Sequence, residues 1–365
     1  MRHRTKLPGC NGWRGRHAVI ARHAKGDVSG AYLREGLVMD DTMTAADYRQ
    51  VIDAPTRRFI NQLEAFYTNA TTDLDASKQR AVYAAMCNAL SHGRAPGITS
   101  VDQSLAGVPA RHYTKNCASG SGDSDDHAGQ AMRPRIIYFH GGGFVVGGLD
   151  SHDDICSEVC AATGLDVLAL AYRLAPEHRH PAMFDDAVAA TRAILDDGKG
   201  PVILCGDSAG GNLAAATAHA LRHPDIIGQL LIYPSLGPDP GTGSFIIHAE
   251  APLLTRDDLH YYLAVRLDGP DRVQDPQLYP LADRDFSRLP PTVVVTAECD
   301  PLRDDGPAYC KAISADGGRA QWIDTPGLVH GFLRARGTVD RAGRAFRNIT
   351  DALVMLGNGG WVFKE

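Results

Sequence analysis

A serine lies within the run Gly-Asp-Ser-Ala-Gly-Gly at positions 206–211, and this run is the strongest chemical signal in the chain. The apolar residues 201–205 before it predict a buried strand, and the small residues 212–218 after it predict a helix. Gly-x-Ser-x-Gly between a strand and a helix is typical of a nucleophile elbow, a turn too tight for any bulk beside the serine. The sequence therefore predicts that Ser208 presents its hydroxyl at a helix N-terminus as a nucleophile.

A serine hydroxyl needs a base to take its proton and a third group to orient that base. On an elbow of this kind the expected chain order is serine, acid, histidine. His330 is the only histidine downstream of Asp300, so it is the predicted base. Asp300 lies just beyond the predicted strand 292–296, where functional groups of α/β sheets collect, and is the predicted acid. Asp324 also ends a strand before the histidine and stays open as the alternative.

Three glycines follow another predicted strand, in the run His-Gly-Gly-Gly-Phe at positions 140–144. Bare backbone of this kind can point several N–H groups at one spot. We expect the N–H groups of Gly141 and Gly142 to join that of Ala209 in an oxyanion hole. A phosphate-binding loop is the competing interpretation. It is disfavoured because no Gly-Lys-Ser/Thr follows and the Gly-x-Gly-x-x-Gly spacing is absent.

Four apolar residues near these motifs are candidates for the wall of a substrate pocket, although each fits an ordinary core position equally well: Phe144, Leu236, Leu254 and Phe332.

No metal site is predicted. His152, Cys156 and Cys160 have the spacing of ligands along one helix. A rise of about 1.5 Å per residue, however, places the first and last roughly 12 Å apart, too far to share one ion. His178 and His180 are expected to be loop residues rather than ligands.

The elements that must position these residues follow from the hydrophobic pattern. Strand-like runs alternate with helical ones, at 111–114, 135–139, 167–171, 202–205, 229–233, 292–296 and 320–324. Several runs, such as 136–139, are apolar on both faces, as in strands covered by helices on each side. The expected fold class is α/β, with a mostly parallel central sheet. Residues 45–90 show helical spacing, and the segment 235–269 contains one helical stretch, 256–265, and is expected to act as a lid.

Composition narrows the class of protein. The chain has 365 residues, a net charge of −6 and 44% hydrophobic residues, which gives no support to nucleic-acid binding. No apolar run approaches the length of a membrane span. The eight cysteines form no disulfide-like framework, which favours a cytoplasmic protein with reduced thiols.

Residues 1–38 carry eight Lys or Arg against two acids and are expected to be a disordered extension. Residues 117–132, rich in Gly, Ser and Asp, are expected to form an exposed hairpin loop.

Five motifs occur in one order: His-Gly-Gly-Gly at 140–143, Tyr-Arg-Leu-Ala-Pro-Glu at 172–177, Gly-Asp-Ser-Ala-Gly-Gly at 206–211, Asp-Pro-Leu-Arg-Asp-Asp-Gly at 300–306, and His-Gly-Phe at 330–332. In order and spacing they resemble the bacterial hormone-sensitive lipase family of esterases, from about residue 63 to the C-terminus. The resemblance implies an α/β-hydrolase fold with its catalytic core in 91–234 and 270–365. It implies a helical cap built from 39–90 and 235–269, and a triad of Ser208, Asp300 and His330.

The resemblance also implies an activity. It predicts a carboxylic ester hydrolase that works through an acyl-enzyme without a cofactor, on a small-molecule ester. We expect acyl chains shorter than about eight carbons, since no long apolar interfacial segment is present. A homodimer is kept open as the quaternary state. Two alternatives remain. One is a non-catalytic small-ligand receptor on the same fold, such as the plant gibberellin receptors that lack the histidine; the other is an amidase, peptidase or lactonase. The presence of His330 argues against the receptor.

Overall fold

The computed structural model describes residues 47–67, 74–116 and 132–363. The predictions for residues 1–38 and, apart from Met132, for the loop 117–132 lie outside them. The helices are α1 (Tyr48–Val51), α2 (Ala54–Glu64), α3 (Ala76–Leu90), α4 (Asp153–Thr163), α5 (Ala182–Asp196), α6 (Ala209–Leu221), α7 (Ser244–Ile247), α8 (Arg256–Arg266), α9 (Asp305–Ala315) and α10 (Asp340–Gly357). Short 3₁₀ turns are η2 (Asp150–His152), η3 (Pro280–Ala282) and η4 (Phe332–Ala335).

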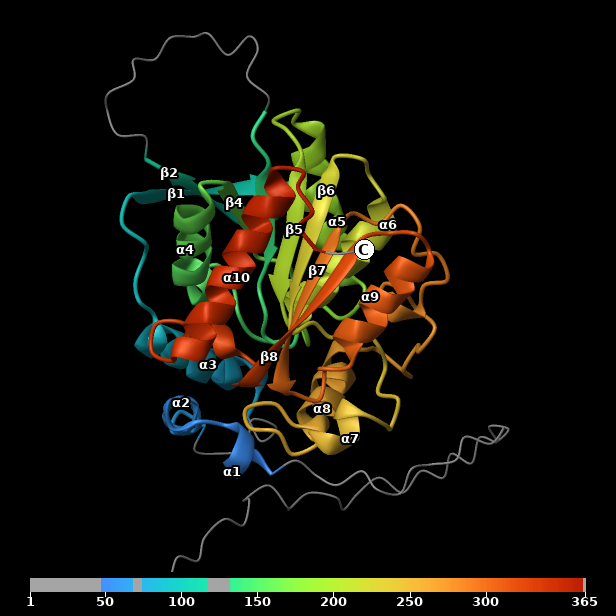
Figure 1. The fold of residues 1–365 in the computed structure, drawn as a ribbon. Helices are drawn as coiled ribbons and strands as arrows, with labels where there is room; N and C mark the ends of the chain where they lie inside the picture. Colours follow the sequence, from blue (N-terminus) through green and yellow to red (C-terminus); the bar gives the residue numbers. More distant parts are fainter. Residues whose placement is uncertain (1–46, 68–73, 117–131, 364–365) are drawn as a thin grey trace, which may run out of the picture. The chain divides into compact units, whose positions relative to one another are not determined.

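The strands form a single eight-stranded sheet in the order β1-β2-β4-β3-β5-β6-β7-β8 (Figure 1). Their bounds are β1 (Ile98–Leu105), β2 (Val108–Lys115), β3 (Arg135–Phe139), β4 (Asp166–Leu170), β5 (Val202–Asp207), β6 (Ile226–Ile232), β7 (Thr292–Cys299) and β8 (Ala320–Val329). Strands β3 to β8 pair in parallel, whereas β1 with β2 and β2 with β4 are antiparallel. The predicted α/β class with a mostly parallel sheet is confirmed.

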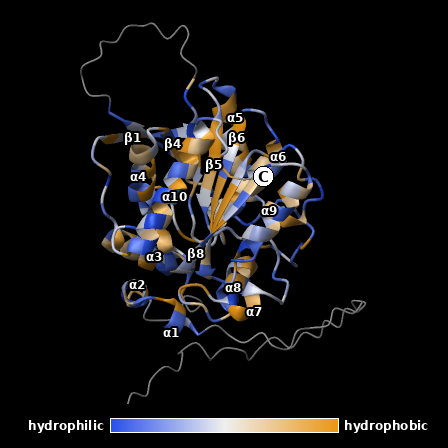
Figure 2. Cartoon of the chain, in the orientation of Figure 1, coloured by the Kyte–Doolittle hydropathy of each residue, from blue (hydrophilic) through white to orange (hydrophobic). Residues whose placement is uncertain are grey.

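Two apolar cores lie on opposite faces of this sheet because side chains alternate along each strand. On β5, Ile203 and Cys205 belong to the core shared with α4 and α10, while Val202 and Leu204 belong to the core shared with α5, α6 and α9. Figure 2 shows the resulting concentration of hydrophobic residues in the central strands. The sheet is therefore a rigid support whose strand ends can hold functional groups in place.

Strand β1 is absent from the sequence prediction. Of its eight residues only Ile98 is buried, so the strand lacks the apolar alternation that would reveal it. It forms because it pairs antiparallel with β2 through a tight turn. Both turn residues, Ala106 and Gly107, have positive φ (50° and 86°), as two-residue hairpin turns require.

Helices α3 and α8 both lie toward the same end of the sheet (Figure 1). Each begins with a side-chain cap: Asp75 accepts from the N–H of Lys78, and Thr255 forms a capping box with Asp258. Gln79 of α3 donates to the Tyr261 hydroxyl of α8. None of the helices in the described ranges is long and apolar enough to cross a membrane.

Candidate active site

Ser208 occupies the turn between β5 and α6 in a strained conformation, with φ 54° and ψ −118°. Its N–H donates to the Ile232 carbonyl of β6 (2.8 Å), which ties the turn to the neighbouring strand. A Cβ at Gly206 would collide with the carbonyl of Gly210, and one at Gly210 with the carbonyl of Phe139. The framing glycines are therefore required because backbone passes where a side chain would lie.

Three predicted residues come together at the ends of three elements. The Ser208 Oγ lies 2.9 Å from His330 Nε2, and His330 Nδ1 lies 2.7 Å from Asp300 Oδ2. The second carboxylate oxygen of Asp300 accepts from the N–H of Leu302 (2.9 Å), which fixes its orientation. Asp300 is fully buried, whereas the His330 side chain keeps 13% of its surface exposed. The imidazole is thus accessible while its carboxylate partner is shielded from water.

Asp324, the alternative acid, is engaged elsewhere. Its carboxylate pairs with the Arg303 guanidinium (2.8 Å) and accepts from the Thr296 hydroxyl (3.0 Å). His330 is bonded to Asp300 instead. The expectation that Asp324 ends a strand is wrong, because β8 continues to Val329, whereas Asp300 directly follows β7.

The prediction for Gly141 as an oxyanion donor is wrong, because its N–H is already used. It donates to Asp207 Oδ1 (3.0 Å), and a Cβ on Gly141 would collide with the same carboxylate. Among the hydrogen bonds of the described residues, the N–H groups of Gly142 and Gly143 have no acceptor. As the first residue of α6, Ala209 likewise has no intrahelical acceptor for its N–H.

Asp207 carries a buried polar network that the sequence analysis missed. Besides Gly141, its carboxylate accepts from the Tyr138 hydroxyl (2.9 Å) and lies 3.3 Å from His152 Nε2. Arg334, just after His330 in the chain, lies 3.4 Å from the same imidazole nitrogen. Burial alone would raise the pKa of Asp207, but His152, Arg334 and Tyr138 outweigh it and lower that pKa to about 2. The sequence did contain a signal for this network, because the elbow motif places the acid Asp207 directly before the nucleophile Ser208.

His140 is held as a neutral imidazole beneath the glycine loop. Its Nδ1 lies 2.8 Å from the Gly141 carbonyl, and its ring stacks on Tyr172 with centroids 4.3 Å apart. Its Nε2 is buried and has no hydrogen-bond partner among the described residues. Burial, with a smaller contribution from His152, lowers the pKa of His140 to about 4.

The four candidate pocket residues are all buried. Phe332 packs edge-on against Tyr233, whose ring lies 4.7 Å from the His330 imidazole. The Arg266 guanidinium covers the Phe144 ring at 3.6 Å. Leu236 belongs to the core of α5, α6 and α9, and Leu254 packs with Phe245 and Leu302. Their part in substrate binding stays a prediction.

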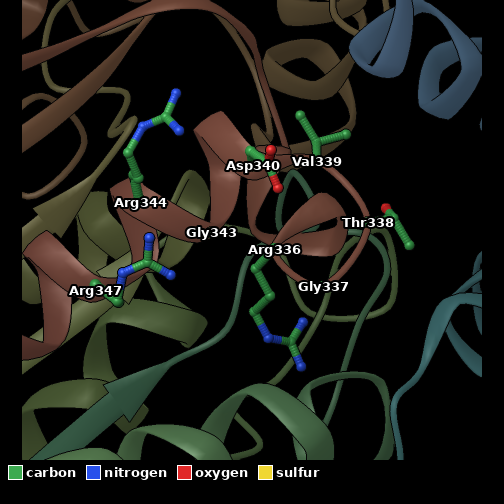
Figure 3. Close-up of a pocket in the computed structure, with 8 residues that line it drawn as sticks. All are labelled: Arg336, Gly337, Thr338, Val339, Asp340, Gly343, Arg344 and Arg347. Atoms are coloured by element: carbon green, nitrogen blue, oxygen red, sulfur yellow. The ribbon is translucent and has the colours of Figure 1, made fainter.

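A small polar pocket lies elsewhere, at the start of α10 (Figure 3). Its lining contains none of the predicted site residues: Arg336, Gly337, Thr338, Val339, Asp340, Gly343, Arg344 and Arg347. The Arg336 guanidinium is bound by Asp154 and Glu158, so it is not free for a ligand.

The residues with metal-like spacing have other surroundings. His152 contacts Asp207, and Cys156 and Cys160 of α4 are buried in the apolar core. His180 is a buried loop residue 3.5 Å from Asp275. Within the described ranges, no three His, Cys, Asp or Glu residues are grouped as metal ligands.

Comparison with known proteins gives a consistent result. Residues 136–334, more than half of the chain, match the family model described as the alpha/beta hydrolase fold. The chain is 38% identical to carboxylesterase NlhH of Mycobacterium tuberculosis over 225 residues, which cover 58% of this chain and 70% of that protein. It is 32% identical to an ethyl acetate hydrolase of Pseudomonas putida over 228 residues, which cover 60% and 72%.

Solved structures extend the likeness across the fold. An esterase described as a member of the bacterial hormone-sensitive lipase family superimposes with a TM-score of 0.72 at 27% identity. The superposition covers 83% of this chain and 98% of that one. The chain therefore belongs to the α/β-hydrolase family, within its hormone-sensitive lipase branch of esterases.

Proposed function

We propose that the protein hydrolyses carboxylic esters through an acyl-enzyme formed on Ser208. The observation that carries this proposal is the continuous chain of short contacts from Ser208 Oγ to His330 Nε2 (2.9 Å) and from His330 Nδ1 to Asp300 Oδ2 (2.7 Å). This is the arrangement that activates a serine hydroxyl. His330 acts as general base, and Asp300 holds its tautomer and stabilises the imidazolium.

The reaction has two halves. In the first, Ser208 Oγ attacks the ester carbonyl carbon while its proton passes to His330 Nε2, and the imidazolium then protonates the leaving alcohol. In the second, His330 takes a proton from water, the hydroxide oxygen attacks the acyl carbon, and the proton returns to Ser208 as the acid leaves. Each half passes through a tetrahedral oxyanion.

The donors that stabilise this oxyanion are the N–H groups of Gly142, Gly143 and Ala209. The support is that these groups have no acceptor in the described part of the chain, whereas the N–H of Gly141 is occupied by Asp207. Ala209 adds the positive end of the α6 dipole, because it is the first residue of that helix. Preorganised donors of this kind contribute about 10²–10³-fold each to turnover.

The experiment is hydrolysis of p-nitrophenyl butyrate by the wild type and by Ser208→Ala. We expect the substitution to lower kcat by at least about 10³-fold, because both acyl transfer steps require the hydroxyl. Ser287→Ala, which removes a hydroxyl from the loop before β7, is the matched control and should leave kcat unchanged. A fluorophosphonate should label the wild type but not Ser208→Ala. Near-normal turnover in Ser208→Ala would refute the nucleophile, and an unlabelled, inactive wild type would favour a non-catalytic receptor.

The same assay tests the acyl group. We propose a preference for acyl chains shorter than about eight carbons, as the family resemblance of the sequence implies. The printed name of the Pseudomonas putida relative, an ethyl acetate hydrolase, supports a short acyl group. In a series of p-nitrophenyl esters from acetate to palmitate, kcat/KM should be highest among the short members. A maximum on emulsified long-chain esters would contradict this preference.

A further inference from the structure

An arginine of the N-terminal helices reaches the glycine loop from outside the catalytic core. Arg80 of α3 donates from Nε to the carbonyl of Val145 (2.8 Å) and from Nη2 to the carbonyl of Ala175 (2.9 Å). Glu177 binds the same guanidinium through both carboxylate oxygens, at 2.9 and 2.6 Å. Ala175 is itself bonded to the loop, since its N–H donates to the Phe144 carbonyl (2.8 Å). Of these five hydrogen bonds, one ends on Val145 and one on Phe144, so Arg80 is tied to the segment after the glycines both directly and through Ala175.

The contact with Val145 continues through two peptide units. The Val145 carbonyl belongs to the same planar peptide as the Val146 N–H, and that N–H donates to the Gly142 carbonyl (3.0 Å). The Val145 N–H donates to the same carbonyl at 3.0 Å. The Gly142 carbonyl in turn shares its peptide unit with the Gly143 N–H. Because the C=O and N–H of a trans peptide point in opposite directions, fixing one fixes the other.

We propose that Arg80 is a positioning residue that sets the direction of the Gly143 N–H, and with it the geometry of the oxyanion hole. The proposal rests on the function proposed above, because it needs Gly143 as an oxyanion donor. The guanidinium fixes the orientation of the peptide unit between residues 145 and 146. The N–H groups of Val145 and Val146 then fix the peptide unit between residues 142 and 143. That second peptide unit determines the direction of the Gly143 N–H. Gly143 has φ 59°, and bare glycine alone would leave this peptide free to rotate.

The chemistry of the side chain fits this task. A planar guanidinium presents several donors in fixed directions and can serve two carbonyls and a carboxylate at once. Lysine in its place would keep the positive charge but would lack the planar set of donors in fixed directions. The position also explains why a helix far from the catalytic motifs in sequence carries an arginine directed at them: residue 80 precedes Val145 by 65 positions.

The test compares Arg80→Met, Arg80→Lys and the control Lys78→Met. Lys78 is on the same helix, is exposed and pairs only with Asp75 among its described contacts, so its substitution removes one charge without touching the loop. On p-nitrophenyl butyrate we expect Arg80→Met to lower kcat by about 10-fold or more with KM within about twofold, because misplaced donors act on the transition state. Arg80→Lys should lie between, and Lys78→Met should match the wild type.

A trifluoromethyl ketone gives the decisive readout. Ser208 Oγ bonds to its carbonyl carbon, the proton passes to His330, and the carbonyl oxygen becomes an oxyanion held by the same N–H donors. Its inhibition constant should rise by the factor by which kcat falls. An unchanged kcat in folded Arg80→Met, or a lowered kcat with an unchanged inhibition constant, overturns the proposal. If circular dichroism shows that Arg80→Met is unfolded, the same two criteria apply to Arg80→Lys.

Failure of this inference is distinguishable from failure of the proposed function. An inactive wild type, or an active Ser208→Ala, refutes the proposed function. A wild type that hydrolyses esters, an inactive Ser208→Ala and an Arg80→Met with wild-type kcat refute only the role of Arg80.

Discussion

At the scale of single residues, two aspartates have opposite surroundings: Asp300 directly follows β7, whereas Asp324, expected from the sequence to end a strand, lies in the middle of β8. The buried carboxylate of Asp300 receives the imidazole and one backbone N–H, whereas that of Asp324 lies against the Arg303 guanidinium. An acid that must hold one tautomer of a histidine cannot also neutralise an arginine. The partner of each carboxylate therefore determines its role.

Replacing these two acids by their amides separates the roles. Asp300→Asn should lower kcat by about 10⁴-fold with little change in fold, because an amide no longer selects the required imidazole tautomer. Asp324→Asn weakens only a half-buried ion pair and should change kcat by less than about twofold. Ester hydrolysis, with circular dichroism of both variants, measures the difference. Equal losses of kcat would contradict the assignment of Asp300.

Chain order and strand ends select Ser208, Asp300 and His330, since these rules describe where along the chain a group lies. Their side chains lie within hydrogen-bond distance, and their role as a triad stays a prediction. For the glycine loop the sequence rules fail at Gly141. Which N–H of three consecutive glycines is free depends on peptide orientation. That orientation is determined by Asp207 and by distant contacts that leave no local pattern in the sequence.

At the scale of elements, the elbow works because β5 and α6 approach each other without intervening side chains. Gly210, in the first turn of α6, lies against the carbonyl of Phe139 at the end of β3. The close approach brings the helix N-terminus next to the loop that follows β3. The nucleophile and the glycine loop are thereby joined by backbone contact.

Enlarging Gly210 should break this contact. Gly210→Ala places a Cβ on a backbone carbonyl that cannot move aside, and we expect a loss of about 3 kcal/mol or more in the free energy of unfolding. Gly164→Ala, at the end of α4, meets open space, and its cost comes only from the positive φ (68°) of that position, about 1 kcal/mol. Urea unfolding monitored by tryptophan fluorescence gives both values. Equal stabilities for the two variants would show that the close approach is not required.

The elements differ in how far they can be predicted. The buried parallel strands have long apolar runs, so the expected segment 135–139 coincides with β3 and 202–205 falls within β5. Strand β1 is not predicted from the sequence, because pairing with β2 rather than burial of its own side chains stabilises it. An edge strand of this kind is encoded by its neighbour and its turn, not by its own composition.

At the scale of the whole molecule, burial makes two interior histidines harder to protonate. His140 has a pKa of about 4 in the folded protein against an ordinary value of 6.5, chiefly because it is buried. Burial also lowers the pKa of His152, although Asp207 opposes that shift. The unfolded chain binds protons at these sites more readily than the native one. Acidification therefore favours unfolding between about pH 6.5 and pH 4.

The resulting prediction concerns stability at two pH values. Between about pH 7.5 and about pH 5, titration of His140 should remove about 2 kcal/mol from the free energy of unfolding. His140→Gln cannot titrate there, so its stability should fall by about that much less over the same interval. Urea unfolding of both proteins at both pH values measures the difference. Parallel losses in the two proteins would mean that His140 does not contribute to acid sensitivity.

The cytoplasmic location and a homodimeric state stay predictions at this scale.

The bond between Ser208 and His330 joins positions 122 residues apart, and this distance has a consequence for biosynthesis. Translation proceeds from the N-terminus, so the elbow and the glycine loop leave the ribosome well before the histidine that completes them. On the mechanism proposed above, Ser208 has no base during that interval. Ester hydrolysis would then begin only once β8 has added to the edge of the sheet and brought His330 to the serine, when the fold is nearly complete.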